Sequence, residues 1–597
     1  MADGDRIVRV LPDVPAIDRG FDYVVPAGLI QRIPLAVGTM VRIPLAGRRV
    51  GGWITELDVT PPEGVRLSAI TKVVGIGPTA EMIDLCAWAA WRWAGRTATF
   101  LRMASPDRMV SRVGVERPSL DRVGAEATTA AQSATLSGLP AELFDQQRAV
   151  IRLPPTADPM DVIATGARLG PLLVITPSAH EAVSLARQMR SVGIRTALHP
   201  SDWASAAGGG VSVVGARGAA FAPMAHVAGV VIVDEHDERL QAEGSPTWHA
   251  RDVVLERARR ARVPAVMVSP CPTVDSVQRS PLLLVDRAVE RRGWPPLLIV
   301  DRRDDEPGRG GLYSEQLVGA LRGDATVLCV LNRVGRAQLL ACAACGAITS
   351  CERCEGPMSL DAVGSLWCRR CDLERPLVCQ ACGASKLKNL RVGVTRAREE
   401  LVALLREPVG EVTGTTEIDR GARILVGTEA LLHRVGSAGV VAFLEFDQEL
   451  FAPRYRAAEQ ALAMLARAAR VVGGRAGQIV IQTRAPGHEV IRAAVTANPS
   501  EVLDIERARR SIISFPPAVT LVEIGGEAAA AYVEALTSPG RPPASALPGD
   551  ATVLHPDDGT WLVSSADRRA LLDALAATVR PPGRLRLRVD PMRLRSS

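Results

Sequence analysis

Lysine is almost missing from this sequence of 597 residues, although basic residues are plentiful. Of the 71 lysine and arginine residues, only Lys72, Lys386 and Lys388 are lysines. We attribute this preference to a GC-rich coding bias, because alanine, valine, glycine and proline are also abundant. Chemistry that needs a lysine between residues 73 and 385 is therefore excluded.

Aromatic residues and long apolar runs are scarce as well. Only 4% of the residues are aromatic, and no uninterrupted apolar run reaches the roughly 18–20 residues that a membrane-spanning helix needs. The opening stretch MADGDRIVRVLPDVPA lacks a basic segment followed by an apolar one, so we expect no signal peptide. These absences favour a cytoplasmic protein without a membrane partner.

The overall composition is that of a globular protein, with 47% hydrophobic and 23% charged residues. The chain is too long for a single core, so we expect three or more domains. The net charge of +6 permits a polyanionic partner such as nucleic acid but does not require one.

The order of strand-like and helix-like patterns predicts an α/β protein with smaller domains at both ends. Apolar runs that alternate with helical patterns indicate two parallel sheets with flanking helices. The expected divisions are a β-rich domain at 1–104, a linker at 105–138, a first lobe at 139–275, a second lobe at 276–341 and 383–504, a cysteine-rich insert at 342–382, and an α+β domain at 505–597.

Eight of the eleven cysteines form four C-x-x-C turns. Two such turns complete a tetrahedral sulfur shell, so four turns predict two closed, structural Zn²⁺ sites per chain. Disulfides or redox pairs are disfavoured in a cytoplasmic chain. Four turns can pair in three ways, and spacing alone does not choose. The turns are Cys342/Cys345, Cys351/Cys354, Cys368/Cys371 and Cys379/Cys382.

An acidic cluster follows an apolar run in the stretch VIVDEHDE, residues 231–238. A strand that ends in D-E-x-D is typical of carboxylates that hold Mg²⁺ on the phosphates of a nucleotide. Asp234, Glu235 and Asp237 are therefore candidate metal-binding acids. By itself the pattern is a modest signal, because acids after a strand often form only a solvated turn.

The phosphate-binding loop that such a site needs is absent. The expected G-x-x-x-x-G-K-S/T sequence cradles phosphates with backbone amides and a lysine. Its place reads RLPPTADPMDVIATGARLG, in which prolines replace glycines and remove amide donors. Arg152 or Arg168 could stand in for the lysine, but neither has a glycine cradle. We therefore interpret the acids as relics and predict no hydrolysis of ATP.

Several motifs together resemble the PriA family of primosomal replication-restart proteins (primosomal protein N′). The most specific is LNRVGRAQLLACAACGAITSCERCEGPMSLDAVGSLWCRRCDLERPLVCQACGA, with its lead-in and four C-x-x-C turns. FDYVVP, VVGARGAAFAP, WHARD, VGTEALL, DQELFAPRYRAAEQ, FPP and VDPM extend the resemblance over nearly the whole chain. It implies two RecA-like helicase lobes, a 3′-end DNA-binding domain, a zinc-ribbon-like insert and a C-terminal α+β domain.

The resemblance also implies roles for particular residues. The family pairs its cysteine turns in a nested way, which places Cys342, Cys345, Cys379 and Cys382 on one zinc ion and Cys351, Cys354, Cys368 and Cys371 on the other. Phe21 and Asp22 would hold the terminal base and sugar of a 3′ end, Gly47 would allow close backbone approach, and Lys72 would supply a nearby cation. Without the resemblance, FDY is better explained as a strand of a small barrel.

Departures from the family pattern concern the nucleotide. The family-like GSATP is here Val268–Pro272, with the sequence VSPCP. The arginine motif that reaches the terminal phosphate is ambiguous between residues 466–470 and 474–477. Residues 105–138 leave room only for a reduced or lost winged helix. We also expect His249 and Arg251 to pair with the acids across the cleft between the lobes.

The sequence supports three hypotheses. The first is a monomeric adaptor that binds forked or single-stranded DNA and recruits primosome proteins, the replicative helicase and single-stranded-DNA-binding protein, without helicase activity. The second is an active ATP-dependent 3′–5′ helicase. The third is a zinc-ribbon nucleic-acid-binding module on an inactive helicase body. The missing lysine favours the first over the second, and FDYVVP and VDPM disfavour the third.

Overall fold

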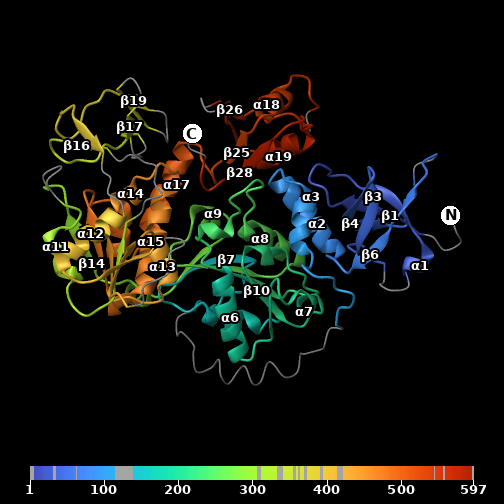
Figure 1. Ribbon diagram of the computed structural model, residues 1–597, viewed down its shortest axis with the longest axis horizontal. Helices are drawn as coiled ribbons and strands as arrows, with labels where there is room; N and C mark the ends of the chain where they lie inside the picture. Colours follow the sequence, from blue (N-terminus) through green and yellow to red (C-terminus); the bar gives the residue numbers. More distant parts are fainter. Residues whose placement is uncertain are drawn as a thin grey trace.

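The chain folds into an N-terminal β domain, two α/β lobes and a C-terminal α+β domain, with a cysteine-rich insert on the second lobe (Figure 1). The two parallel sheets with flanking helices confirm the predicted fold class. The computed structural model describes residues 6–30, 35–61, 64–114, 139–305, 311–331, 340–353, 358–360, 364–368, 373–389, 394–412, 421–542, 545–555 and 559–594.

The N-terminal domain is a small barrel followed by two helices. Its strand order is β5-β2-β1-β4-β3-β6. The N–H groups of Ile70 and Thr71, between β5 and β6, donate to the carbonyls of Val24 and Arg42, so this segment touches both edges of the sheet and closes it. The elements are β1 (Arg6–Pro12), β2 (Phe21–Val25), α1 (Ala27–Ile30), β3 (Met40–Leu45), β4 (Arg48–Leu57), β5 (Ser68–Ala69), β6 (Lys72–Gly75), α2 (Ala80–Arg92) and α3 (Thr97–Ala104).

The first lobe is a parallel sheet of order β13-β7-β12-β11-β8-β10-β9. Its central strands are apolar and buried throughout, as expected for a parallel sheet covered on both faces. The elements are β7 (Arg148–Arg152), α5 (Met160–Ala167), β8 (Leu172–Ile175), α6 (Ala179–Ser191), β9 (Thr196–Leu198), α7 (Trp203–Ala207), β10 (Ser212–Gly215), η1 (Arg217–Phe221), β11 (Gly229–Val233), η2 (Glu238–Leu240), α8 (Ala250–Ala261), β12 (Ala265–Ser269), α9 (Val274–Val277), β13 (Leu282–Leu284) and α10 (Arg287–Arg292).

The second lobe is a parallel sheet of order β14-β24-β23-β15-β22-β21. The elements are β14 (Leu297–Asp301), α11 (Glu315–Leu321), β15 (Val327–Val330), α12 (Val394–Leu405), β21 (Val409–Val412), β22 (Ile424–Gly427), α13 (Ala430–Arg434), β23 (Val440–Phe443), α14 (Asp447–Leu450), α15 (Ala457–Val471), η3 (Gly474–Ala476), β24 (Gln478–Thr483), α16 (Glu489–Val495) and α17 (Ser500–Ile512). Helix α15 buries most of its alanine and leucine side chains in the core of this lobe.

Three observed boundaries differ from those expected from the sequence. Helix α17 packs against α15 and α16, so the second lobe extends past residue 504 to Ile512. β13 pairs in parallel with β7, so the first lobe extends past residue 275 to at least Leu284. In the insert, β16 (Leu340–Cys342) pairs with β20 (Leu387–Asn389), so this unit is wider than 342–382. The remaining strands of the insert are β17 (Met358–Leu360), β18 (Leu366–Cys368) and β19 (Glu374–Arg375).

The C-terminal domain is an antiparallel sheet of order β26-β27-β25-β28 with two helices. Its elements are β25 (Thr520–Gly525), α18 (Ala529–Thr537), β26 (Thr552–Leu554), β27 (Trp561–Ser565), α19 (Arg568–Ala577) and β28 (Arg586–Val589). Residues 105–114 have no helix or strand, and residues 115–138 lie outside the described ranges, so the prediction of a reduced winged helix stays a prediction.

A single hydrophobic core joins the N-terminal helices, the first lobe and the C-terminal domain. At its centre the rings of Phe100, Phe221 and Trp248 lie 5.3–6.4 Å apart. Arg92 at the end of α2 is buried between Asp252 of α8, at 3.3 Å, and Asp590 after β28, at 2.8 Å. These shared contacts hold three parts of the chain in one arrangement.

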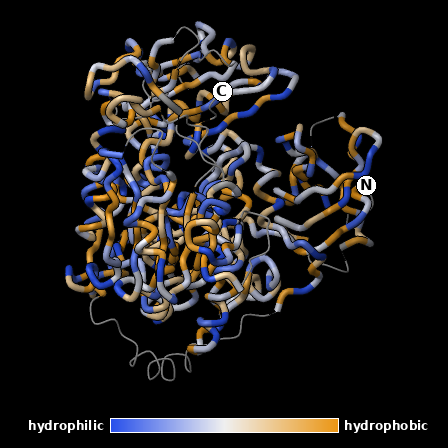
Figure 2. The backbone as a smooth tube through the Cα atoms, turned by 60° about the vertical axis from the view of Figure 1, so that its left-hand side comes forward, coloured by the Kyte–Doolittle hydropathy of each residue, from blue (hydrophilic) through white to orange (hydrophobic). Residues whose placement is uncertain are grey.

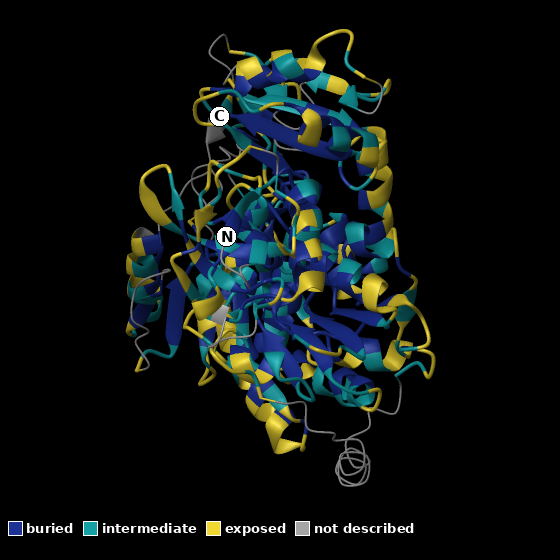
Figure 3. Cartoon of the chain, turned by 90° about the vertical axis from the view of Figure 1, so that its right-hand side faces the viewer, coloured by how far each residue is buried: buried dark blue, intermediate teal, exposed yellow. Residues whose placement is uncertain are grey.

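Apolar residues lie along the inner strands of the lobes, and exposed residues follow their outer helices and turns (Figures 2 and 3). Within the ranges given above, no helix combines the length and apolarity needed to cross a membrane.

Candidate functional site

Two of the three candidate acids, Asp234 and Glu235, follow β11 at its carboxyl end and are buried. Asp234 lines the cleft between the lobes. Asp234 adopts a left-handed backbone conformation with φ of +50°. In open α/β sheets this edge is where ligands bind. The position of the acids therefore agrees with a site for a magnesium-bound nucleotide, and their partners decide whether that site is free.

Asp234 is bound by an arginine of the opposite lobe. Arg470 on α15 donates from both terminal nitrogens to the two carboxylate oxygens, at 2.6 and 2.8 Å. Burial alone would raise the pKa of Asp234, but the adjacent guanidinium holds that pKa well below its usual range. Asp234 is therefore ionised, and both its oxygens are occupied by a protein cation.

The same arginine lies against the turn that replaces the phosphate loop. Arg470 Nε donates to the carbonyl of Pro155 at 2.9 Å. Pro154, Pro155 and Pro159 in this turn have no N–H to offer a phosphate. A cavity of about 330 Å³ remains between the turn, Asp234 and Arg470. This space is where the phosphates of a nucleotide would have to fit.

Neither of the two possible substitutes for the missing lysine serves this turn. Arg152 at the end of β7 is buried and directed toward Glu290 at 3.2 Å and Ser500 at 2.6 Å. Arg168, at the end of α5, is exposed. The sequence left two candidates for the arginine motif, residues 466–470 and 474–477. In the structure Arg467 and Arg470 of the first candidate line the cleft, whereas Arg475 of the second is exposed.

Glu235 is fully hydrogen-bonded inside the first lobe. It accepts from the backbone N–H of Thr273 at 2.8 Å, from the Thr273 hydroxyl at 3.1 Å and from the Ser276 hydroxyl at 3.0 Å. Arg251 adds an ion pair at 3.5 Å. A carboxylate held in this way positions the turn after β12 and has no free lone pair directed at a substrate.

The expected pairing across the cleft is correct for neither His249 nor Arg251. Arg251 does pair with Glu235, but both residues belong to the first lobe. The Nδ1 atom of His249 accepts the N–H of Arg251 and caps α8, and burial lowers the pKa of His249 to about 3. The prediction was wrong because the WHARD residues begin helix α8, which belongs to the same lobe as the acids and does not line the opposite side of the cleft.

Other ion pairs join the two lobes in the interior. Asp275 of α9 binds Arg456 at 2.7 Å and Arg510 at 3.4 Å, and both arginines come from the second lobe. Glu459 accepts the N–H of Val274 at 2.8 Å. The four side chains of this network are at most 13% exposed, and Val274 contributes only its backbone N–H. Breaking one buried partner of such a network is costly, so the lobes are held in a closed arrangement.

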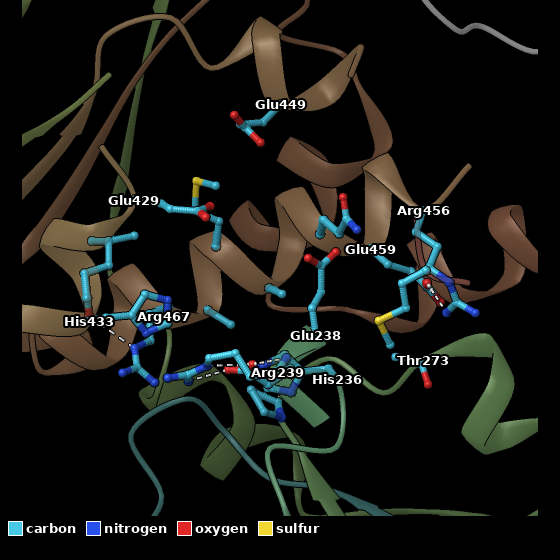
Figure 4. Close-up of a pocket in the computed structure, with 18 of the residues that line it drawn as sticks. His236, Glu238, Arg239, Thr273, Glu429, His433, Glu449, Arg456, Glu459 and Arg467 are labelled. Atoms are coloured by element: carbon cyan, nitrogen blue, oxygen red, sulfur yellow. Dashed lines mark hydrogen bonds and ion pairs between the residues drawn. The ribbon is translucent and has the colours of Figure 1, made fainter. Parts of the chain in front are cut away.

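The cleft is still hollow beside this network. A cavity of about 480 Å³ lies between His236–Arg239 of the first lobe and residues of α13 and α15, and Figure 4 shows Glu429, Glu459 and Arg467 directed toward it. Burial raises the pKa of Glu429, and the charge of Glu449 adds to the effect. Charges of both signs line this cavity, which shares Pro270 and Arg470 with the cavity at the proline turn.

The structure brings together one of the two predicted cysteine sets. The sulfur atoms of Cys342, Cys345, Cys379 and Cys382 all lie within 4.8 Å of one another, with Cys342–Cys382 at 3.5 Å and Cys345–Cys379 at 3.6 Å. Four thiolates at about 2.3 Å from Zn²⁺ in a tetrahedron would be about 3.8 Å apart, which the observed spacing fits.

Local backbone structure explains why these four sulfur atoms converge. Gly346 and Gly383 each follow the second cysteine of a turn, with φ of +74° in both, and their N–H groups donate to the carbonyls of Cys342 and Cys379. For the other set, Cys351 and Cys368 are buried, whereas Cys354 and Cys371 lie outside the described residues. The second zinc site therefore stays a prediction.

The four predicted DNA-contact residues are placed on the N-terminal barrel. Phe21 opens β2, and the guanidinium of Arg19 lies 5.0 Å from its ring centre. Asp22 is paired with Arg9 at 2.9 Å. Gly47, with φ of +76°, forms the turn between β3 and β4 and faces open space. Lys72 is exposed on β6. Their roles in DNA binding stay predictions.

The sequence did not single out Arg470 as the partner of Asp234, nor the pairs of Arg456 and Arg510. A usable signal existed for Arg470. A buried acid that has lost its lysine-containing loop needs another cation, and one of the two arginine motifs lies in a strongly apolar helical pattern that packs toward the cleft.

Comparisons with known proteins agree with these parts. Residues 9–106 match the family model of the PriA 3′ DNA-binding domain. The chain is 27% identical to the probable replication restart protein PriA of Mycobacterium tuberculosis, covering 97% of this chain and 99% of the relative. It is 29% identical to the replication restart protein PriA of Bacillus subtilis, covering 51% and 42%. A solved structure of the helicase MrfA bound to DNA has a TM-score of 0.36 at 12% identity, covering 66% of this chain and 55% of that one.

Proposed function

Because this chain is a homologue of the PriA replication restart proteins over nearly its whole length, we propose that it is a fork-binding adaptor in replication restart that does not couple ATP hydrolysis to unwinding. Its N-terminal domain captures DNA at abandoned or stalled forks. The remaining domains form the platform on which partners assemble to reload the replicative helicase. Zinc stabilises the insert on this platform.

The pairing of Arg470 with Asp234 carries the second half of this proposal. Phosphoryl transfer depends on positioning and on charge neutralisation by a metal ion, an amide cradle and a lysine or arginine. Here the acid that would hold the metal is bound by Arg470 at 2.6 Å, and the same arginine occupies the proline turn. A nucleotide would have to break this buried pair before it met a site with no lysine.

The other side chains of the site do not compensate for the missing phosphate-binding loop. Removing a single preorganised charge-stabilising donor typically slows a reaction by on the order of 10²–10³. The proline turn lacks several such donors at once, and Glu235 is already saturated by Thr273, Ser276 and Arg251. We therefore expect no turnover above background.

One observation favours the alternative, an active ATP-dependent 3′–5′ helicase. Asp234 and Glu235 are both retained, at the carboxyl end of a central parallel strand, which is the geometry that a magnesium-binding pair needs. If Arg470 releases Asp234 when DNA binds, the carboxylate of Asp234 becomes available. The two functions therefore differ in a measurable activity.

The test is a DNA-stimulated ATPase assay on the full chain. The wild type is compared with Asp234→Asn/Glu235→Gln and with Arg470→Ala, with and without forked DNA. The proposal expects all three to give the same background rate. Hydrolysis by the wild type that the double substitution abolishes would establish the helicase alternative. Fork binding is measured in parallel, and a wild type that binds neither forked nor single-stranded DNA contradicts the adaptor itself.

A further inference from the structure

After β28 the chain leaves the C-terminal domain and enters the cleft between the two lobes. We call residues 590–593 the strap, and they include the last three residues of the VDPM motif. Met592 is buried, and both Met592 and Arg593 line the cavity of about 480 Å³ between the lobes. The strap is therefore part of the cleft although it belongs to neither lobe.

The first lobe holds the backbone of the strap through the buried side chain of Gln241. The Nε2 atom of Gln241 donates to the carbonyl of Asp590 at 2.9 Å, and its Oε1 atom accepts the N–H of Met592 at 2.8 Å. One side-chain amide thus satisfies an acceptor and a donor on either side of Pro591. Such a two-sided contact fixes the position of this backbone segment on the lobe.

The second lobe holds the same segment from the other side. The hydroxyl of Tyr455, just before α15, donates to the carbonyl of Pro591 at 2.8 Å and accepts from Nε of Arg456 at 3.0 Å. Arg456 is in turn paired with Asp275 of the first lobe. The strap is therefore connected by hydrogen bonds to the ion-pair network that joins the lobes.

Arg593 supplies a cation to acids that come from both lobes. It binds Glu238 of the first lobe at 2.5 Å, and the charges of Glu429 and Glu449 of the second lobe also act on it. Figure 4 shows these three acids around the cavity. The second carboxylate oxygen of Glu238 is buried and has no hydrogen-bond partner among the described residues. Removing Arg593 would therefore leave like charges facing one another across the cleft.

We propose that the strap docks only when the two lobes are closed and that it locks them in this arrangement. Its contacts with Gln241 and Glu238 come from one lobe and its contact with Tyr455 from the other, so they exist together only in the closed cleft. Docking and closure then stabilise each other by the same free energy, because such coupling is reciprocal. A molecule that enters the cavity must displace Met592 and Arg593, so release of the strap opens this side of the cleft.

Hydrogen–deuterium exchange of the full chain tests the strap at two places. Peptides that contain Met592 report docking of the strap, and peptides of α13, which lines the cavity, report closure of the lobes. Arg593→Glu turns a partly exposed ion pair into a repulsion and should speed exchange at both places by about 3–10-fold. Glu238→Arg/Arg593→Glu restores the pair with its charges exchanged and should return most of the protection.

Two further variants control for charge and folding. Arg584→Glu, at an exposed arginine of the same domain, makes the same change of charge and should alter neither set of peptides. Gln241→Met removes both hydrogen bonds of the first lobe to the strap without changing the charge, and it should act like Arg593→Glu. Exchange in the buried strand β25 should stay unchanged in every variant, which separates release of the strap from unfolding of the C-terminal domain.

The decisive variant is Arg470→Ala, because Arg470 joins the lobes at Asp234 and Pro155 and not at the strap. Reciprocal coupling requires faster exchange at Met592 in this variant as well. Unchanged exchange at Met592 overturns the proposal, because the strap would then be held by one lobe alone. The proposal also fails if Arg593→Glu frees Met592 while α13 stays protected, since the strap would then bind without holding the lobes together.

Discussion

Arg470 and Asp234 belong to different lobes and are joined by two hydrogen bonds of 2.6 and 2.8 Å. The third N–H direction of Arg470 leads to the carbonyl of Pro155. One side chain of the second lobe thus neutralises the acid of the first lobe and packs against the turn that replaced the phosphate loop. The cleft is closed by the protein itself, and a nucleotide is not needed to hold the lobes together.

The pair predicts a coupling between the two lobes. Removing either partner leaves the other charge largely buried, so Arg470→Ala and Asp234→Ala should each lower the free energy of unfolding by about 1–3 kcal/mol, a range reduced because Arg470 is about one-third exposed. The double substitution should cost less than the sum. The measurement is denaturant unfolding of the three variants, with the exposed Arg475→Ala as a neutral control. Additive effects would show that the pair does not join the lobes.

The pH dependence of stability should follow Asp447, the first residue of α14, and Glu445, two residues before it. Burial, with repulsion from Asp447, raises the pKa of Glu445 to about 7, and burial raises the pKa of Asp447 to about 6. In the unfolded chain both lie near 4. The folded state therefore holds extra protons between about pH 4 and 7, and stability must fall as pH rises through this window.

Glu445→Gln imitates the protonated form and should flatten this dependence. At pH 8 the substitution should stabilise the chain by on the order of 2–3 kcal/mol, and at pH 5 it should have little effect. Asp234 acts in the opposite sense, because its lowered pKa keeps its contribution above about pH 4 and loses it in stronger acid. The Glu445 prediction is tested by measuring the thermal midpoints of the wild type and Glu445→Gln from pH 5 to 8. The substitution Glu56→Gln at an exposed position is the control. Identical profiles for wild type and Glu445→Gln would contradict it.

Metal analysis of the purified chain should return about two zinc ions. Cys342→Ser should remove about one, because a closed site with three thiolates loses its tetrahedral shell. Cys351→Ser should remove the other and leave the lobes folded. Cys86→Ala is the control, since Cys86 is a core residue of α2 distant in sequence from the insert. Less than one zinc ion in folded wild-type protein would refute the assignment.

Capture of a 3′ end predicts a selective role for Phe21. Base stacking on an aromatic ring contributes about 1–3 kcal/mol, so Phe21→Ala should weaken binding to a fork with a 3′-hydroxyl at the branch and leave a 3′-phosphate fork unaffected. The guanidinium of Arg19 now covers the ring and must move aside. Met109→Ala, at an exposed apolar residue, is the control. Equal affinity of the wild type for both forks would exclude the pocket.

The predictability of the fold differed between its parts for physical reasons. The runs that became β8, β11 and β12 are apolar except for Ser269 at the end of β12, which is the pattern of a buried parallel strand. β13 has only three residues and gains its identity from pairing with β7, which no local pattern announces. The sequence analysis therefore ended the first lobe at residue 275, before β13.

The candidate site was predictable in its residue types but not in its pairings. The acids after β11 and the four turns of cysteines could be read directly, since their spacing defines their chemistry. The partner of Asp234 was not assigned, although Arg470 lies within the apolar helical pattern of α15, which ends at Val471, and Arg475 lies beyond it. Long-range ion pairs such as Asp275–Arg456 leave no periodic trace at all.

The position of Arg92 also bears on how the protein is made. Its partner Asp590 lies 498 residues later, and the partner of neighbouring Trp91, Asp573, lies 482 residues later. At about 5–20 residues per second, a ribosome needs roughly 25–100 s to travel between them. For that time one face of α2 is synthesised but uncovered, and β28 finally closes the junction. Helix α2 is thus completed by a contact whose other half is synthesised 498 residues later.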